Sequence, residues 1–283
     1  MSKFRELLNK ELKFSDKEKE FLPAGYQRIG DIIIINLDNK VKRKEKQIAL
    51  AIKKLFPSVK TICIREGKII GKLRKPRVRI ILGKETETIH HEGRCLYQID
   101  VKKAMFSQGN LFERHRLSKN ILKNEIIVDM FAGIGYFSIP FAKQGAKVYA
   151  IELAKDSYRY LVKNSKLNKV DKNLVATHGD SKKELIILAK KGIKADIISM
   201  GYIPTPISFF KYALKLAKLN TRILFHCLLS KYPEKEKKDL DKLLLHLKKD
   251  AEKEKFRFSY SKHFVKSFSP GNNHWVLELK LTR

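Results

Sequence analysis

Short apolar runs alternate with amphipathic segments along the second half of the chain. The apolar runs are rich in β-branched residues and predict strands; four of them are IIVDMF, KVYAIEL, ADIISMGY and RILFHCLL. The segments between them carry apolar residues at helical spacing and predict helices at 155–167, 182–191, 207–219 and 234–254. Strands that alternate with helices indicate a parallel sheet covered by helices on both faces.

The end of the chain breaks this rhythm. Two apolar runs, FRFSYSKHFVKSFS and HWVLELKLTR, are separated by the turn residues 270–272 with no helix between them, so we expect an antiparallel hairpin. An α/β sheet closed by such a hairpin is typical of class I methyltransferases. The pattern therefore predicts a Rossmann-like catalytic domain at 106–283.

The first hundred residues have a different pattern. We expect a helix at 2–20, a buried strand within 25–37, a helix at 41–56 and short, mostly antiparallel strands between 61 and 100. This arrangement predicts a smaller α+β domain at 1–105.

Composition adds a strong charge imbalance to this picture. The 283 residues include 61 Lys and Arg against 30 Asp and Glu, a formal net charge of +31. Such an excess attracts polyanions, and says nothing about fold. One basic cluster falls on an expected turn and strand of the smaller domain, where contacts with RNA phosphates and a simple solvated turn both remain open. Its members are Lys72, Arg74, Lys75, Arg77 and Arg79.

The cysteines and the apolar runs exclude several classes of protein. Cys63, Cys95 and Cys227 are far apart and form no pair with zinc-binding spacing, so we expect neither a metal site nor a disulfide framework. No apolar run is long enough to cross a bilayer, and the charged amino-terminal segment lacks an apolar signal region. These features predict a cytoplasmic protein without a membrane partner.

The most specific motif is VDMFAGIGYFSI, at 128–139. Gly133 and Gly135 let the strand-to-helix turn tighten so that a ligand can approach the backbone. A dinucleotide site would favour a third small residue where Ser138 stands, so an NAD enzyme is a distant alternative. Asp129 would repel a phosphate but suits the ammonium of a methionine moiety. The segment, which includes Phe131 and Ala132, resembles motif I of S-adenosylmethionine enzymes.

Two further carboxylates follow the next two expected strands. Glu152 lies where a carboxylate would bind both ribose hydroxyls, and Asp180, followed by Ser181, lies where an acidic residue usually meets the adenine amino group. Each carboxylate would be costly if buried without a partner. With Asp129 they predict an S-adenosylmethionine site at the carboxyl ends of three strands.

The fourth strand ends in the sequence MGYIP, at 200–204. Amino methyltransferases usually carry Asn/Asp-Pro-Pro here. With AMFSQGNLFERHRL and DMFAGIGYF, this strand makes the whole chain resemble the archaeal tRNA wybutosine-synthesising enzymes, relatives of the tRNA guanine-N1 methyltransferases. In that family Met-Gly-Tyr marks the branch that transfers the aminocarboxypropyl group. The resemblance implies that Met200, Gly201 and Tyr202 position the substrate, the base 4-demethylwyosine in phenylalanine tRNA.

The resemblance also implies that Ser107 and Arg114 contact the cofactor, and that Arg114 binds the carboxylate of the cofactor. Relatives often have Ser-Pro where this chain has Ser107-Gln108. Neither His178 nor His226 is assigned a role in proton transfer, because a buried histidine is more often structural. We expect a monomer that binds tRNA and needs no metal.

Two alternatives remain at this point. The chain could be a guanine-N1 methyltransferase with an unusual fourth strand, against which Met-Gly-Tyr counts. It could also be a non-catalytic RNA-binding protein with a vestigial transferase domain, against which the full set of motif I glycines and acidic residues counts.

Overall fold

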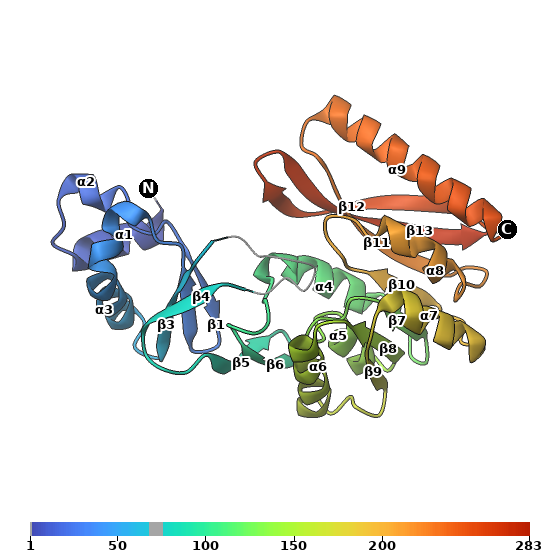
Figure 1. Ribbon diagram of the computed structural model, residues 1–283, viewed down its shortest axis with the longest axis horizontal. Coiled ribbons are helices and arrows are strands. Elements are labelled where there is room, and N and C mark those ends of the chain that lie inside the picture. The colour runs from blue at the N-terminus through green and yellow to red at the C-terminus, as the bar shows by residue number, and fades with distance from the viewer. Residues whose placement is uncertain (1, 68–75) are drawn as a thin grey trace. The chain divides into compact units, whose positions relative to one another are not determined.

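The computed structural model describes residues 2–67 and 76–283. The chain divides into two compact units, which meet between Gln108 and Gly109 (Figure 1). Each unit has its own hydrophobic core. Within the described residues, no helix is both long and apolar enough to cross a membrane.

The first unit is an α+β structure built around a four-stranded sheet with the order β1-β2-β3-β4. A separate pair, β5 and β6, forms a two-stranded antiparallel sheet. The elements are α1 (Lys3–Glu11), α2 (Asp16–Lys19), β1 (Tyr26–Ile29), β2 (Ile32–Ile35), the 3-10 helix η1 (Asn39–Lys44), α3 (Glu45–Leu55), β3 (Thr61–Arg65), β4 (Val78–Leu82), β5 (Glu87–Glu92) and β6 (Cys95–Asp100).

Two expectations for this unit need correction. The helix expected at 2–20 is interrupted after α1, because Ser15 and Glu18 form a capping box that starts the new helix α2. The apolar run near Gly25 contains two strands rather than one. Gly30, at φ +55°, forms the turn of a hairpin, and a Cβ at this position would lie 2.2 Å from Thr88 Oγ1.

The second unit has the alternating helices and strands expected from the sequence. They are the 3-10 helix η2 (Gln108–Asn110), which begins at the boundary, α4 (Leu111–Lys119), β7 (Ile126–Asp129), α5 (Ser138–Lys143), β8 (Lys147–Glu152), α6 (Lys155–Leu167), β9 (Leu174–His178), α7 (Ser181–Lys190), β10 (Ile197–Met200), the 3-10 helix η3 (Ile207–Phe209), α8 (Phe210–Leu214), β11 (Arg222–Ser230), α9 (Pro233–Lys253), β12 (Arg257–Ser269) and β13 (Asn272–Thr282).

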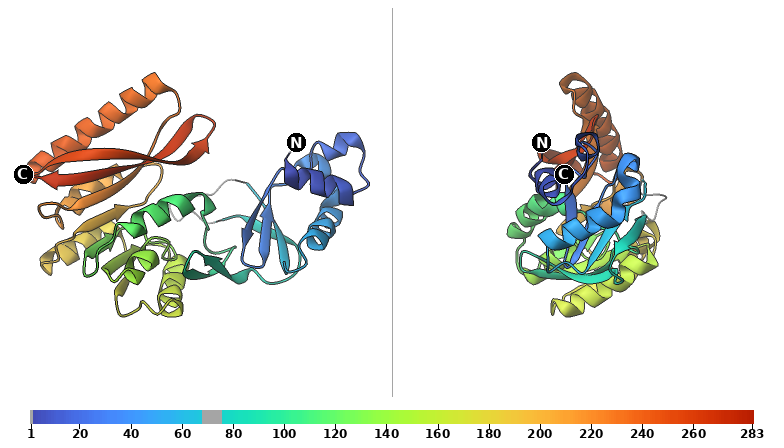
Figure 2. Two further views of the ribbon diagram at one scale, coloured as in Figure 1. Left: turned by 180° about the vertical axis from the view of Figure 1, so that it is seen from behind. Right: turned by 90° about the vertical axis from the view of Figure 1, so that its left-hand side faces the viewer.

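These strands form one seven-stranded sheet with the order β12-β13-β11-β10-β7-β8-β9. The five strands from β9 to β11 are parallel, and β13 returns antiparallel between β11 and β12. The expected carboxy-terminal hairpin is therefore present, and α9 packs beside it (Figures 1 and 2). A class I methyltransferase sheet with a terminal hairpin, preceded by a smaller α+β domain, was predicted and is confirmed.

One helix of this unit is shorter than its apolar pattern suggests. The segment expected to be helical at 207–219 forms η3 and α8, and its regular helix ends at Leu214. Leu216 and Ala217 remain buried although they lie beyond the end of this helix. The apolar spacing there reports packing against the sheet rather than a continuous helix.

Candidate active site

The motif I loop between β7 and α5 contains two glycines with different tasks. Gly135, at φ +101°, leaves no room for a side chain, because a Cβ there would be 2.6 Å from Ile139 Cδ1 of α5 and 3.1 Å from Leu161 Cδ1 of α6. Gly133, at φ +59°, turns its N–H toward the next strand and donates a hydrogen bond of 2.8 Å to Glu152 Oε2. Gly135 thus permits close packing of the loop against neighbouring side chains, and Gly133 directs its backbone N–H toward Glu152.

Asp129 ends β7 and is completely buried. Its carboxylate accepts hydrogen bonds from Ser138 Oγ at 2.6 Å and from the backbone N–H of Phe131 at 3.4 Å. Burial and, to a lesser extent, the nearby charge of Glu152 raise the pKa of Asp129 from 3.8 to about 6, although these hydrogen bonds oppose the shift. This geometry favours a role in holding the loop, so direct contact with a methionine ammonium stays a prediction.

Glu152 ends the neighbouring strand β8 and is partly exposed. Besides the Gly133 N–H, it accepts a hydrogen bond of 2.7 Å from the Ala154 N–H through Oε1. Burial raises the pKa of Glu152, although the backbone hydrogen bonds oppose the shift. The carboxylate is therefore fixed beside the glycine loop, and its contact with a ribose stays a prediction.

Asp180 follows β9, the next strand in the sheet. It is the N-cap of α7 and accepts a hydrogen bond of 2.8 Å from the Lys182 N–H. The adjacent Ser181 is buried and donates its hydroxyl hydrogen bond to the backbone carbonyl of Met130. Ser181 therefore ties α7 to the end of β7, and a cofactor contact for it stays a prediction.

Asp129 and Glu152 end β7 and β8, and Asp180 follows β9, so all three lie at the carboxyl ends of adjacent parallel strands. The structure brings the three predicted carboxylates to the carboxyl end of the parallel strands, the usual place for a ligand in open α/β sheets.

Helix α4 contributes an arginine to this unit. Arg114 is only 3% exposed, and its guanidinium carbon lies 5.5 Å from the centre of the Tyr136 ring in the motif I loop. The neighbouring Glu113 is also buried and forms two 2.8 Å hydrogen bonds with Arg116. The contact between Arg114 and Tyr136 was not predicted, because the two residues lie on different sequence segments.

Residues 200–202, the Met-Gly-Tyr sequence at the end of β10, differ in their surroundings. The Met200 side chain is buried in the core, so any influence it has on a substrate passes through its backbone. Tyr202 is partly exposed and packs against Phe131 of motif I, with ring centres 5.2 Å apart. Phe209, which was not predicted from the sequence, stands edge-on to Phe131 with ring centres 5.0 Å apart. These three rings form an aromatic cluster beside Gly201.

A lysine accompanies this aromatic cluster. Lys182 Nζ lies 4.7 Å from the centre of the Phe209 ring. The three rings are tilted or edge-on to one another, and the cation lies against one of them. The one sequence signal for Phe209 is that apolar residues continue beyond the end of β10.

The remaining predicted residues lie elsewhere. Ser107 belongs to the first unit, whereas the other predicted cofactor residues belong to the second. Of the basic cluster, Lys72, Arg74 and Lys75 lie outside the described residues. Arg77 is exposed. Arg79 is held by Glu45 at 2.7 Å and by Glu66 at 2.7 Å, which raise its pKa, so its ion pairs compete with any phosphate.

The two histidines considered at strand ends also have structural partners. His178 stacks on Tyr158 with ring centres 5.3 Å apart, and its Nε2 lies 3.1 Å from the Leu153 carbonyl oxygen. His226 is buried and pairs with His274. Within the described ranges, no three His, Cys, Asp or Glu side chains gather as a candidate metal site.

A seven-stranded sheet of this order, with a glycine loop and carboxylates at successive strand ends, defines a class I S-adenosylmethionine-dependent transferase. Residues 88–258 match the family described as the TRM5/TYW2 methyltransferase domain, and residues 4–86 match the TYW2 N-terminal domain. The chain belongs to the TRM5/TYW2 family, as the sequence motifs predicted.

Relatives with assigned activities extend over nearly the whole chain. One is the tRNA(Phe) (4-demethylwyosine(37)-C(7)) aminocarboxypropyltransferase of Methanocaldococcus jannaschii, 37% identical over 91% of this chain and 98% of the relative. The structure of TYW2 from Pyrococcus horikoshii in complex with MeSAdo has a TM-score of 0.79 at 30% identity, covering 98% and 97% of the two chains. Trm5b from Pyrococcus abyssi has a TM-score of 0.83 at 28% identity, covering 98% and 80%.

Proposed function

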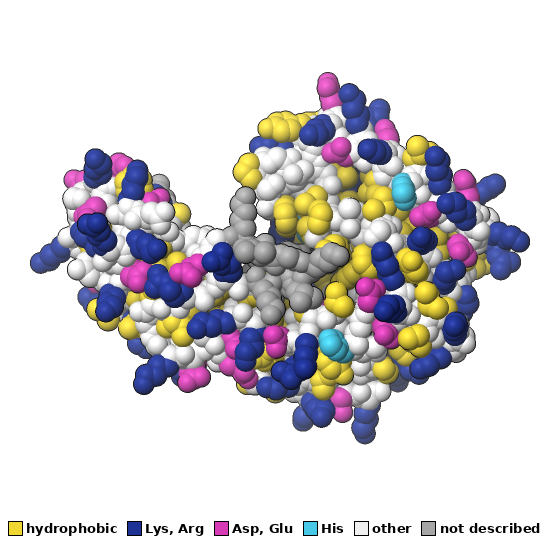
Figure 3. Space-filling model, viewed as in Figure 1, with side chains coloured by type: hydrophobic (Ala, Val, Ile, Leu, Met, Phe, Trp, Pro, Cys, Tyr) yellow, Lys and Arg dark blue, Asp and Glu magenta, His cyan; other side chains and the backbone are white. Residues whose placement is uncertain are grey.

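We propose that this protein transfers the 3-amino-3-carboxypropyl group of S-adenosylmethionine to 4-demethylwyosine, the modified base 3′ to the anticodon of phenylalanine tRNA. Support comes from the family, from the near-complete match to an aminocarboxypropyltransferase, and from the ligand site at the strand ends. The net charge of +31 suits a polyanionic substrate. Lysine and arginine side chains are scattered over the face of the molecule seen in Figure 3.

The observation that carries this proposal is the end of β10. In place of an Asn or Asp side chain that could hold an amino nitrogen, the strand ends in Met200, whose side chain is buried in the core. Beyond it, Tyr202 packs on Phe131 beside the motif I loop. An aromatic wall without an amide is suited to a tricyclic base that reacts through a ring carbon.

The reaction balances without a further reagent. The ring carbon of the base attacks the methylene carbon next to the sulfonium, a carbon–carbon bond forms, and the carbon–sulfur bond breaks. The sulfur keeps the bonding electron pair and leaves as neutral 5′-methylthioadenosine, and the ring carbon releases its proton to solvent. Selection of the methylene over the methyl depends on which carbon lies in line with the base.

The finer roles are part of the same proposal. Cofactor contacts are assigned to Ser107, Arg114, Glu152, Asp180 and the motif I loop. The smaller domain, at 1–105, binds tRNA, and the protein acts as a cytoplasmic monomer without a metal.

A guanine-N1 methyltransferase is the second candidate, favoured by the structural similarity to Trm5b. The two candidates differ in which carbon of the sulfonium moves and in which base receives it.

Donor labelling separates them. The protein would be incubated with tRNA carrying either guanine or 4-demethylwyosine 3′ to the anticodon, with S-adenosylmethionine labelled in the methyl group or in the carboxyl carbon. We expect carboxyl label only in the tricyclic-base tRNA, with release of 5′-methylthioadenosine. Methyl label in either tRNA would make the protein a methyltransferase. If neither label moves, the proposed substrate is wrong.

A further inference from the structure

Exposed aromatic side chains gather on the carboxy-terminal hairpin and the start of α9. Among the described residues of the second unit, five aromatic side chains are exposed, and four of them lie here, with exposures between 43% and 59%. They are Tyr232, Tyr260, Phe264 and Phe268. Together with the partly buried Trp275 we call them the hairpin aromatic surface.

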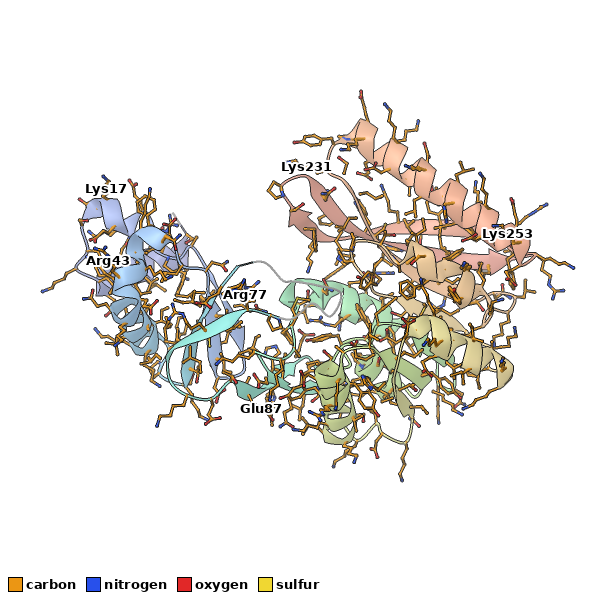
Figure 4. All side chains as sticks on the ribbon, in the orientation of Figure 1. Lys17, Arg43, Arg77, Glu87, Lys231 and Lys253 are labelled. Carbon is orange, nitrogen blue, oxygen red and sulfur yellow. The ribbon has the colours of Figure 1, made fainter. Side chains whose placement is uncertain are left out.

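Contacts within the hairpin hold this surface together. Phe264 on β12 stands edge-on to Trp275 on β13, with ring centres 5.3 Å apart. The Lys231 N–H donates a 3.1 Å hydrogen bond to the Gly271 carbonyl, so Tyr232 is anchored next to the hairpin turn. Figure 4 labels Lys231 at this place, before α9. The rings therefore come from the paired strands β12 and β13 and from the residue that precedes α9.

The surface carries positive charge among its rings. Lys262 Nζ lies 4.2 Å from the centre of the Trp275 ring, and Lys231 Nζ lies 5.2 Å from that of Tyr232. Lys262 also pairs with Glu236 of α9. Residues 257–283 contain five Lys or Arg residues and one acidic residue, Glu278. Glu278 is itself paired with Arg116 and Arg222.

Exposed apolar surface of this kind marks an interaction site, and the charge selects the partner. We propose that the hairpin aromatic surface binds unpaired bases of the tRNA substrate by stacking, while its lysines contact the phosphates. Aromatic rings interleaved with cations are the features by which proteins bind single-stranded nucleic acid. This inference rests on the proposed function, because it takes tRNA as the partner.

Pairing with a second copy through the sheet edge is the competing explanation. β12 is an edge strand, and exposed edges can pair with another strand. However, its register shifts twice, between Phe264 and Lys266 and between Ser267 and Ser269. Such bulges interrupt the ladder of backbone groups and disfavour edge-to-edge pairing.

The chain contains its own reporter, because Trp275 is its single tryptophan. Unmodified tRNA-Phe would be titrated into the full-length protein without cofactor while Trp275 emission is recorded. We expect quenching at low salt, and none with a blunt RNA duplex of equal length, which offers no unpaired base. Equal quenching by both RNAs would contradict base stacking.

Substitutions then test the individual rings. Tyr232→Ala and Phe268→Ala should each weaken binding of a fluorescein-labelled anticodon stem-loop about 5- to 100-fold, the range for one stacked base. Leu245→Ala, at an exposed apolar residue of α9, is the matched control and should leave binding unchanged. Because these side chains are exposed, the melting temperature should not move.

Three further results separate the possibilities. If the two aromatic variants bind RNA as well as the unchanged protein while label transfer proceeds, the surface assignment is wrong and the proposed function stands. If binding falls as expected but neither donor label moves, the proposed reaction fails and the surface stands. If sedimentation shows a dimer that these substitutions disrupt, with RNA binding intact, the surface is an interface between copies.

Discussion

His226 on β11 and His274 on β13 are paired in the interior of the second unit, with Nδ1 of the first 2.9 Å from Nε2 of the second. Both rings are buried, and Phe137 of the motif I loop stands edge-on to His226 with ring centres 5.5 Å apart. Of the two facing nitrogens, one must carry the hydrogen and the other must accept it. The pair thus links the terminal hairpin to the glycine loop.

This pair should make stability depend on pH. Burial, and after it the positive charges of His274, Arg116 and Lys266, lower the pKa of His226 well below its usual 6.5. The unfolded chain binds a proton at this site that the folded chain does not, so stability falls as pH falls below 6.5. His226→Gln should therefore lose less melting temperature between pH 7.5 and 5.5 than the unchanged protein. His246→Gln, at a half-exposed histidine, should behave as the unchanged protein.

Asp129 should act in the opposite direction. Its pKa is raised from 3.8 to about 6, so the folded state binds a proton between these values that the unfolded state does not. Its contribution to stability is complete below pH 3.8 and is lost as pH rises through 6. Asp129→Asn should remove this loss, so that melting temperature declines less from pH 5 to pH 7.5. A steeper decline in the variant would show that the carboxylate is charged and stabilised in the folded protein.

The motif I glycines should differ in their tolerance of a side chain. Gly135→Ala brings a Cβ to 2.6 Å from Ile139 and keeps a positive φ, whereas Gly192→Ala keeps a positive φ of +73° with nothing within 4 Å. The second substitution should cost about 1 kcal/mol for backbone strain alone. We expect Gly135→Ala to cost about 3 kcal/mol or more in urea unfolding, since packing strain adds to it. Equal costs would mean that the Ile139 and Leu161 side chains move away freely.

The sequence predicted the sheet and the strand-end carboxylates because both depend on local patterns. A β-branched run predicts a strand, and the residue at the end of that run lies at the carboxyl end of the sheet whichever strands pair with it. The pairing of Arg114 with Tyr136, of His226 with His274, and of Phe209 with Phe131 depends on segments that meet only after folding. Local patterns also misplaced the end of α8, because Leu216 is buried without being helical.

Glu152 should matter for every ligand that carries a ribose. Its two oxygens are fixed by the Gly133 and Ala154 N–H groups, so a neutral amide at this position would turn a donor toward one of them. Glu152→Gln should weaken both S-adenosylmethionine and 5′-methylthioadenosine about tenfold in calorimetric titration, in line with about 1.4 kcal/mol for a lost charged hydrogen bond. Glu254→Gln, at an exposed residue that lies 3.7 Å from Lys215 Nζ, is the control and should bind both ligands normally.

Substitutions of Arg114 and Arg116, which lie two residues apart on α4, should give separable defects. Arg116 neutralises Glu113, whose side chain is 1% exposed, so Arg116→Met leaves a buried carboxylate unpaired and should cost about 3 kcal/mol of stability. Arg114→Lys keeps the charge but loses the planar fork that binds a carboxylate through two hydrogen bonds. It should weaken S-adenosylmethionine about tenfold and leave 5′-methylthioadenosine, which has no carboxylate, unchanged. If both ligands weaken equally, Arg114 supports the loop through Tyr136 and does not contact the amino-acid end of the cofactor.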